Sequence, residues 1–191
     1  MTLSFHRRNL PHWQPEQGAI FLTWRLHGSF PEGFANHLRQ WSREPRKQFL
    51  NAERVLDAAS TGPLWLKDPE IAACVERAVL RGAELGHYVL QAYVIMPNHV
   101  HALLEPLLPL SRLMNGLKGV SARNANAQLG RTGQPFWQDE SFDHWIRNSG
   151  QFARTKTYIE NNPAKAGLCA RPEDWPWSSV RKLKRAQGGD R

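Results

Sequence analysis

The chain has 191 residues, 41% of them hydrophobic, and its 25 Lys and Arg against 17 Asp and Glu give a net charge of +8 and a pI near 10.0. This composition indicates a folded domain with a polyanionic partner, nucleic acid first and an anionic membrane surface second. No stretch approaches the ~20 apolar residues of a membrane-spanning helix, and the opening residues "MTLSFHRRNL" lack the apolar core of a signal peptide. We therefore expect a cytoplasmic protein without a membrane segment.

The organisation of the chain is simple. No internal repeat, low-complexity tract or long Gly/Ser linker interrupts it. We expect a single domain over residues 1–180, followed by a short basic tail at 181–191.

The first half of the chain predicts one strand and two helical segments. Residues 18–31 alternate apolar and polar side chains, as a strand does, and a helical region with polar insertions follows from about 31 to 60. Residues 68–86 predict a helix, because Asp68 is a suitable N-cap, Pro69 fits the first turn and Gly86 is a natural stop.

Two strands are expected next, at 87–96 and 99–105, joined as a tight hairpin by Pro97 and Asn98. In the second strand His99 and His101 are two residues apart, so both side chains project from the same face. Two adjacent imidazoles suggest a metal site, although polar surface or structural histidines account for the pair equally well. Since the two cysteines of the chain are isolated, a metal would need His and oxygen ligands.

A basic helix follows the hairpin. Residues 109–129 predict an amphipathic helix with Leu110, Leu113, Leu117 and Val120 on its apolar side. No acidic residue occurs between positions 106 and 138. The candidate phosphate-contacting residues of this segment are Arg112, Lys118, Arg123 and Arg131. In the later segment "WQDESFDHW" the alternatives for Glu140 and Asp143 are a carboxylate pair near the metal and a turn bonded to backbone amides; we expect the turn and leave both outside the catalytic set.

A last helix is expected over 149–162, beginning after Ser149 and ended by Pro163. On it Tyr158 and Asn162 lie four residues apart and so share a face. A metal can polarise a phosphodiester oxygen, and a tyrosine can attack the phosphorus as a covalent nucleophile. Two alternatives remain open: Tyr158 as a half-buried packing residue, and Asn162 as a residue of the helix C-terminus.

Four ordered motifs, "MPNHVHALLEP", "LKGVSARNAN", "FWQDESFDHWIR" and "YIENNPAKAGL", resemble the single-tyrosine HUH transposases. The similarity is to the REP-associated tyrosine transposases, which are relatives of the smallest insertion-sequence transposases. It extends to "RRNLPHW", "FLTWRLHGSFP" and "PEDWPWSS", and thus spans nearly the whole chain.

The resemblance assigns roles to four positions. His99 and His101 match the metal-binding pair, and Tyr158 matches the nucleophile that forms a 5′-phosphotyrosine link to DNA. Asn162 stands where relatives place a third, polar metal ligand, often Gln or His. The metal of these transposases is Mg or Mn.

The resemblance further implies an α+β fold, a ferredoxin-like antiparallel sheet with packed helices. It implies a metal-dependent endonuclease and strand transferase that acts on single-stranded DNA with an imperfect hairpin, in association with the nucleoid. Two alternatives are a water-using metal-dependent nuclease and a domesticated protein that binds hairpin DNA or RNA. Some relatives are homodimers that exchange the tyrosine helix, and the helix pattern here leaves the oligomeric state open.

Overall fold

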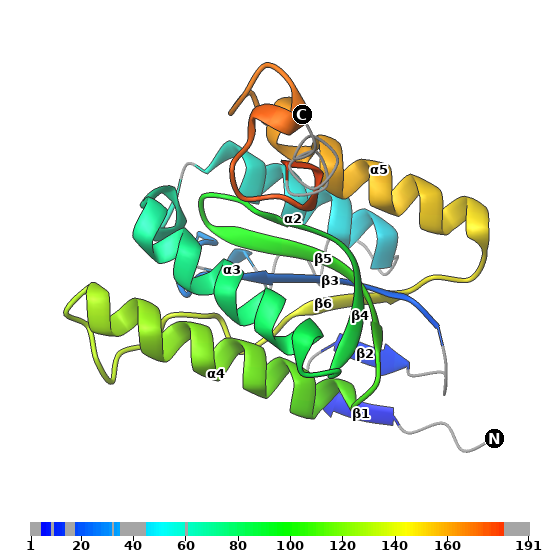
Figure 1. The fold of residues 1–191 in the computed structure, drawn as a ribbon, viewed down its shortest axis with the longest axis horizontal. Coiled ribbons are helices and arrows are strands. Elements are labelled where there is room, and N and C mark those ends of the chain that lie inside the picture. The colour runs from blue at the N-terminus through cyan, green and yellow to red at the C-terminus, as the bar shows by residue number, and fades with distance from the viewer. Residues whose placement is uncertain are drawn as a thin grey trace, which may run out of the picture.

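A computed structural model describes residues 5–8, 10–13, 18–31, 33–34, 45–59 and 61–181 (Figure 1). Its strands are β1 (Phe5–Arg8), β2 (Leu10–Trp13), β3 (Ile20–Arg25), β4 (Tyr88–Ile95), β5 (His99–Pro106) and β6 (Phe142–Trp145). Its helices are α2 (Pro45–Ala58), α3 (Pro69–Glu84), α4 (Leu110–Gln128) and α5 (Ser149–Lys165), with short 3-10 helices η1 (Trp65–Lys67) and η2 (Pro172–Asp174). Within these ranges no helix is long and apolar enough to cross a membrane.

Parts of two predictions fall outside the described residues. They are the basic tail beyond Arg181 and positions 35–44 of the expected helical region. The boundary between the domain and its tail stays a prediction.

The centre of the fold is a four-stranded antiparallel sheet in the order β4-β5-β3-β6. Counted along the chain, these strands stand in the order 2-3-1-4, with α2 and α3 connecting the first pair and α4 connecting the last. This arrangement is ferredoxin-like. The predicted α+β fold with an antiparallel sheet is therefore confirmed. β1 and β2 pair with each other as a separate hairpin.

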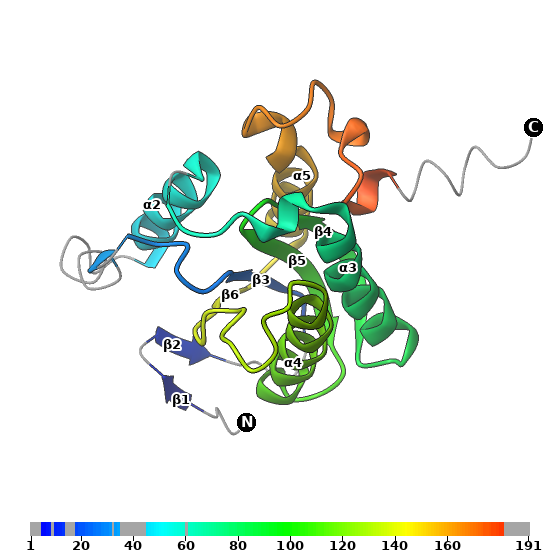
Figure 2. The same cartoon turned by 90° about the vertical axis from the view of Figure 1, so that its left-hand side faces the viewer.

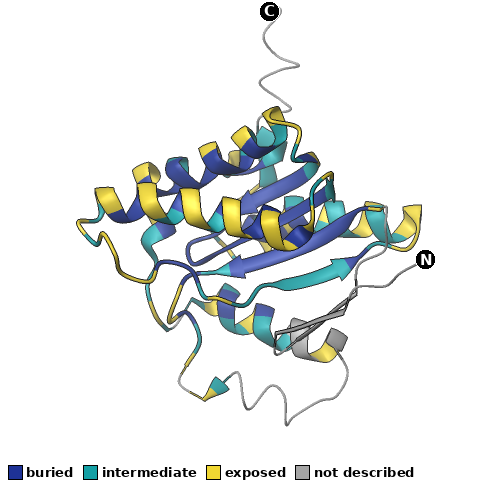
Figure 3. Cartoon of the chain, turned by 90° about the horizontal axis from the view of Figure 1, so that it is seen from below, coloured by how far each residue is buried: buried dark blue, intermediate teal, exposed yellow. Residues whose placement is uncertain are grey.

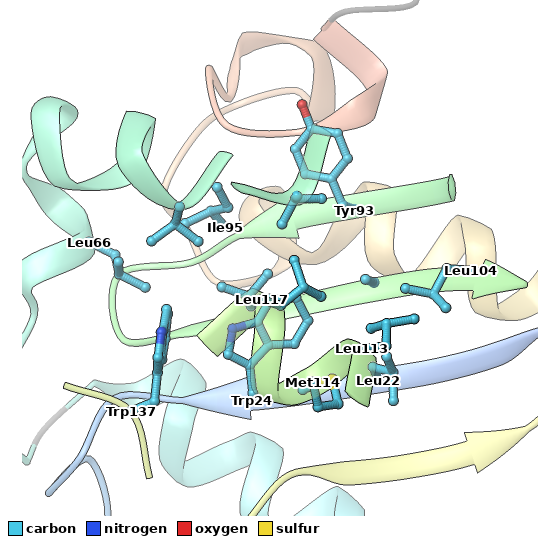
Figure 4. Packing of buried hydrophobic residues seen from close by; sticks show 14 of the residues in the cluster. Leu22, Trp24, Leu66, Tyr93, Ile95, Leu104, Leu113, Met114, Leu117 and Trp137 are labelled. Atoms are coloured by element: carbon cyan, nitrogen blue, oxygen red, sulfur yellow. The ribbon is translucent and has the colours of Figure 1, made fainter. Parts of the chain in front are cut away.

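Helices cover both faces of the sheet (Figures 1 and 2). On one face α3 and α4 lie against each other and enclose the larger core, which includes Trp24 of β3 and Leu113 and Leu117 of α4 (Figure 4). On the other face α5 encloses a smaller core around Phe21 and Ile159. Burial follows these layers, since the strands are mostly buried and the helices expose their outer sides (Figure 3).

The helix and the hairpin predicted for the middle segment are confirmed. The Asp68 side chain caps α3 by accepting the backbone N–H of Glu70 at 2.8 Å, and Gly86 follows the helix with a φ of 69°. β4 and β5 form the expected hairpin, in which the N–H of Met96 donates to the carbonyl of His99 at 2.8 Å.

The ends of α5 differ from the prediction. Asn148, not Ser149, caps the helix with its side chain, and the helix continues past Pro163 to Lys165. A proline this close to a helix end removes only one hydrogen bond, and the Pro163 carbonyl itself accepts from the N–H of Leu168 at 2.9 Å. Pro163 therefore lies inside the helix instead of ending it.

Two further predictions were wrong. Val120 is 49% exposed, because the buried stripe of α4 follows Leu113, Leu117 and Ser121 at four-residue intervals and turns Val120 away from the core. Asp143 lies in β6, paired with Leu22 of β3, where a turn was expected. A four-residue edge strand gives too short an alternation for the sequence to reveal it.

Candidate active site

Two histidines project from the sheet on the face covered by α5. His99 and His101 are the first and third residues of β5, and they pair in register with Arg25 and Thr23 of β3. Both are 0% exposed, whereas Val100 between them belongs to the larger core on the opposite face. The strand alternation thus places both imidazoles on one face of the sheet, as the sequence predicted, and that face is buried.

The ring nitrogens are arranged for a shared ligand. Nε2 of His99 lies 3.1 Å from Nε2 of His101, and Nδ1 of His101 is bonded to the Thr23 hydroxyl at 2.8 Å. Nδ1 of His99 lies 2.7 Å from Oδ1 of Asn98, whose Nδ2 donates to the Leu56 carbonyl. The Asn98 oxygen therefore accepts the Nδ1 proton of His99, and Nε2 keeps its lone pair. Two nitrogens about 2.1 Å from one ion would stand about 3.0 to 3.4 Å apart, which fits this pair.

Glu53 completes the group from α2. It is 3% exposed, and its Oε2 lies 3.0 Å from Nε2 of His101. The ligand atoms of Glu53, His99 and His101 all lie within 4.8 Å of one another, the one such group of three in the described ranges. Glu53 was not among the residues predicted from the sequence. Its signal is weak: a carboxylate three residues before the buried Leu56, on the apolar side of α2.

Burial and charge set the protonation of this group. Burial lowers the pKa of His99 to about 3, with the charge of His101 acting in the same direction and that of Glu53 against it. Burial by itself would raise the pKa of Glu53, but the charge and hydrogen bond of His101 bring it down to about 2. At neutral pH His99 is therefore a neutral imidazole and Glu53 a carboxylate, the forms in which both bind metals.

Tyr158 meets the same carboxylate from α5. Its phenol donates a hydrogen bond to Oε2 of Glu53, and its ring centroid lies 5.6 Å from that of His101. Burial raises the pKa of the phenol well above its ordinary value, and the negative charge of Glu53 raises it further. The Lys165 ammonium lies 5.4 Å from the centre of the Tyr158 ring. The structure thus brings the predicted nucleophile to the predicted histidines.

Asn162 lies one helical turn after Tyr158 and is 1% exposed. It is near enough to the Tyr158 hydroxyl to lower that pKa against the stronger opposing effects, yet among the described residues neither amide atom has a hydrogen-bond partner of good geometry. A buried amide without partners costs about 1–3 kcal/mol. The Asn162 amide is therefore available to bind a ligand, and Asn162 is not the last residue of the helix.

The four basic residues predicted to contact phosphate lie away from this site. α4 covers the opposite face of the sheet, where Arg112 and Arg123 are exposed. Lys118 donates to the carbonyls of residues 138 and 139, and the Arg131 guanidinium lies 4.4 Å from the centre of the Trp65 ring. The structure does not bring these four residues to the histidines, and their contact with DNA stays a prediction.

Comparison with known proteins supports the resemblance found in the motifs. A family model described as "Transposase IS200 like" matches residues 67–162, which include both histidines, Tyr158 and Asn162 but not Glu53. The REP-associated tyrosine transposase of Escherichia coli (strain K12) is 24% identical over 112 residues, 56% of this chain and 64% of that protein. The chain thus matches less than two thirds of that relative's length.

A solved structure supports the fold. It is that of a REP-associated tyrosine transposase bound to a REP hairpin, and its alignment covers 96% of this chain and 87% of the other, with 19% identity and a TM-score of 0.61. At this identity the likeness shows the fold alone.

Proposed function

Since this chain belongs to the family of IS200-like transposases, we propose that it is a metal-dependent endonuclease and strand transferase for single-stranded DNA. The observation that carries the proposal is the convergence of Tyr158, Glu53 and the two histidines at one point between the sheet, α2 and α5. A tyrosine that only packs against the core would not need a buried carboxylate that also lies 3.0 Å from Nε2 of His101.

The residues present fit a divalent metal. His99, His101 and Glu53 offer two nitrogens and one carboxylate oxygen, and Asn162 offers a buried amide near the Tyr158 hydroxyl. When bound, the metal would polarise an oxygen of the phosphodiester. Imidazole ligands suit Mn better than Mg, whereas a carboxylate suits both, so the proposal covers either ion.

In the proposed reaction the Tyr158 oxygen attacks the phosphorus of the cut phosphodiester. A bond forms between the phenol oxygen and phosphorus, the bond from phosphorus to the 3′ oxygen breaks, and the strand leaves with a free 3′ hydroxyl. The phenol proton passes to Glu53, which already accepts its hydrogen bond, and from Glu53 it passes to the departing 3′ oxygen, so no net proton is gained or lost. The 5′-phosphotyrosine conserves the phosphodiester bond energy, so a 3′ hydroxyl can later reverse the step and join strands.

The proposed substrate is single-stranded DNA with an imperfect hairpin. Two observations support it: the charge of +8 and the likeness in fold to a transposase bound to a REP hairpin. In this proposal Arg112, Lys118, Arg123 and Arg131 contribute affinity and salt dependence, not sequence choice. The proposal includes the expected cytoplasmic, nucleoid-associated location, and it holds for a monomer or a homodimer.

A test for a covalent adduct decides the proposal. The protein is mixed with Mn²⁺ and labelled single-stranded DNA from the hairpin-rich flanks of its own gene, and the products are separated on a denaturing gel. We expect a labelled band at protein mass that disappears in Tyr158→Phe. The matched control is Tyr88→Phe, since the Tyr88 hydroxyl donates to the Val79 carbonyl on the opposite face, and this variant should keep the adduct.

Two other outcomes would replace the proposal. Metal-dependent cutting with no adduct would indicate the water-using nuclease. Hairpin binding that survives a combined His99→Ala and His101→Ala change, with no product under any metal, would indicate a recognition protein.

A further inference from the structure

Arg25 lies beside the two histidines, but no role is assigned to it from the sequence, and it lies outside the family match at residues 67–162. It is the last residue of β3 and stands directly opposite His99 in the antiparallel register. Residues in such a pair project to the same face, with Cβ atoms about 4.5–5.5 Å apart. The Arg25 side chain therefore starts from the face that carries His99, His101 and Thr23, and not from the α3/α4 face.

The Arg25 guanidinium is held but not neutralised. Its central carbon lies 3.9 Å from the centre of the Phe30 ring, which reaches back after the turn at residues 27–29, and Phe30 is in edge-to-face contact with Phe34. Among the described residues no carboxylate lies within ion-pair distance of Arg25 and no side-chain hydrogen bond reaches it. The charge of Glu140 acts on it from beyond ion-pair distance.

In this environment the Arg25 guanidinium is charged and suited to bind an anion. Burial lowers the pKa of Arg25 to about 10, against the opposing effect of Glu140, so the group stays charged at neutral pH. A half-buried guanidinium without an ion pair loses hydration and gains only the attraction of an aromatic ring in return. Its planar fork matches the oxygens of a phosphate, which would supply the missing hydrogen bonds.

We propose that Arg25, oriented by Phe30, binds a backbone phosphate of the single strand within one nucleotide of the bond that Tyr158 cuts. This inference rests on the proposed function and adds a residue to it. Arg25 would then hold the DNA strand at the end of the β-sheet next to His99, whereas the basic residues of α4 lie on the opposite face of the sheet. A purely structural stack of Arg25 on Phe30 is the competing interpretation, and it predicts no dependence on any one phosphate.

The test pairs a change in the protein with a change in the DNA. Binding is measured in the Tyr158→Phe background, which cannot cut, with a labelled hairpin oligonucleotide that spans the cut site. One phosphate at a time is replaced by an uncharged methylphosphonate, at the cut position and at its two neighbours. Each oligonucleotide is titrated against the background, the added change Arg25→Gln, and the added change Arg77→Gln. Arg77 is an exposed arginine of α3, so its variant removes the same charge from the opposite face.

We expect one methylphosphonate to weaken binding by the background about 10-fold or more, as the loss of a charged hydrogen bond does. Arg25→Gln should weaken binding to unmodified DNA by a similar factor and be insensitive to that same methylphosphonate. Arg77→Gln should keep the full sensitivity. Arg25→Lys retains the charge but not the planar group that stacks on Phe30, and it is the milder change to the fold. Its binding should keep part of the sensitivity to that methylphosphonate.

The outcomes distinguish a failure of the Arg25 inference from a failure of the proposed function. If Arg25→Gln and the background respond equally to all three methylphosphonates, Arg25 has no phosphate contact near the cut and the inference is overturned. If the Tyr158→Phe background binds no hairpin DNA and the parent forms no adduct, the proposed function fails, and this inference fails with it.

Discussion

Tyr158 and Glu53 are 105 positions apart in the sequence, yet the Tyr158 phenol donates a hydrogen bond to the same Glu53 oxygen that lies 3.0 Å from Nε2 of His101. One carboxylate oxygen therefore connects the candidate metal ligands with the candidate nucleophile. The charge of Glu53 is one cause of the raised pKa of Tyr158, so a divalent cation bound by Glu53 would offset that charge and lower the pKa of the phenol, while the carboxylate remains to accept the phenol proton.

The change Glu53→Gln tests this connection. Gln keeps the shape of the side chain but loses the negative charge that favours a divalent cation. We expect the affinity for Mn²⁺, measured by isothermal titration calorimetry, to fall at least about 10- to 100-fold, together with the yield of adduct. Glu76→Gln is the matched control: Glu76 is also buried and accepts a hydrogen bond from a tyrosine, Tyr93, at 2.7 Å, but on the α3 face. Unchanged Mn²⁺ affinity in Glu53→Gln would remove Glu53 from the ligand set.

Asn98 should control metal affinity without touching the metal. Its amide oxygen accepts the Nδ1 proton of His99 while its amide nitrogen donates to the Leu56 carbonyl of α2. Asn98→Ala removes the group that fixes which nitrogen of His99 carries the proton, and such changes typically cost about 10- to 100-fold in metal affinity. The measurement is the same Mn²⁺ titration, with thermal melting to confirm folding. A folded Asn98→Ala protein with parental affinity would show that the tautomer is fixed by other means.

The sequence was sufficient to find the parts of the site that are local. The HxH spacing on a strand, and Tyr158 with Asn162 one turn later on a helix, follow from the repeat of each element, and the structure places all four side chains together. Glu53 and Arg25 could not be found in this way. Glu53 reaches the site only because α2 lies over the start of β5, and Arg25 only because β3 pairs with β5 in one register. Such non-local pairings are tertiary information, which periodicity does not carry.

Acid should destabilise the metal-free protein through His99. The pKa of His99 is lowered from its ordinary value of 6.5 to about 3, so between these values the unfolded chain binds a proton that the folded protein does not. Stability is therefore present above pH 6.5 and is lost as the pH falls below it, by about 1 kcal/mol for this group between pH 7.0 and 5.5. Glu53 acts in the same direction but only below its ordinary value of 4.5, because its pKa is about 2.

Urea unfolding with a chelator at pH 7.0 and 5.5 measures this loss. The variant His99→Gln should lose less stability over the same interval, by about 1 kcal/mol, since it has no imidazole to protonate on unfolding. The difference between the two proteins reports the loss of the His99 imidazole. Equal losses in the parent and in His99→Gln would contradict the burial of a neutral imidazole at this position.

The change Asn162→Leu separates a ligand role for Asn162 from a structural one. Leu has the same branching at Cγ and no polar atoms, and the Asn162 amide is buried with both atoms unpartnered among the described residues. Removing an unsatisfied amide should leave the metal-free protein as stable as the parent or more stable by about 1 kcal/mol in urea unfolding. In the same variant Mn²⁺ affinity and adduct yield should fall, because the amide oxygen can no longer reach the metal.

A gain in stability with unchanged Mn²⁺ affinity would exclude Asn162 as a ligand. A loss of more than about 2 kcal/mol would show instead that the amide has a structural partner in the folded chain.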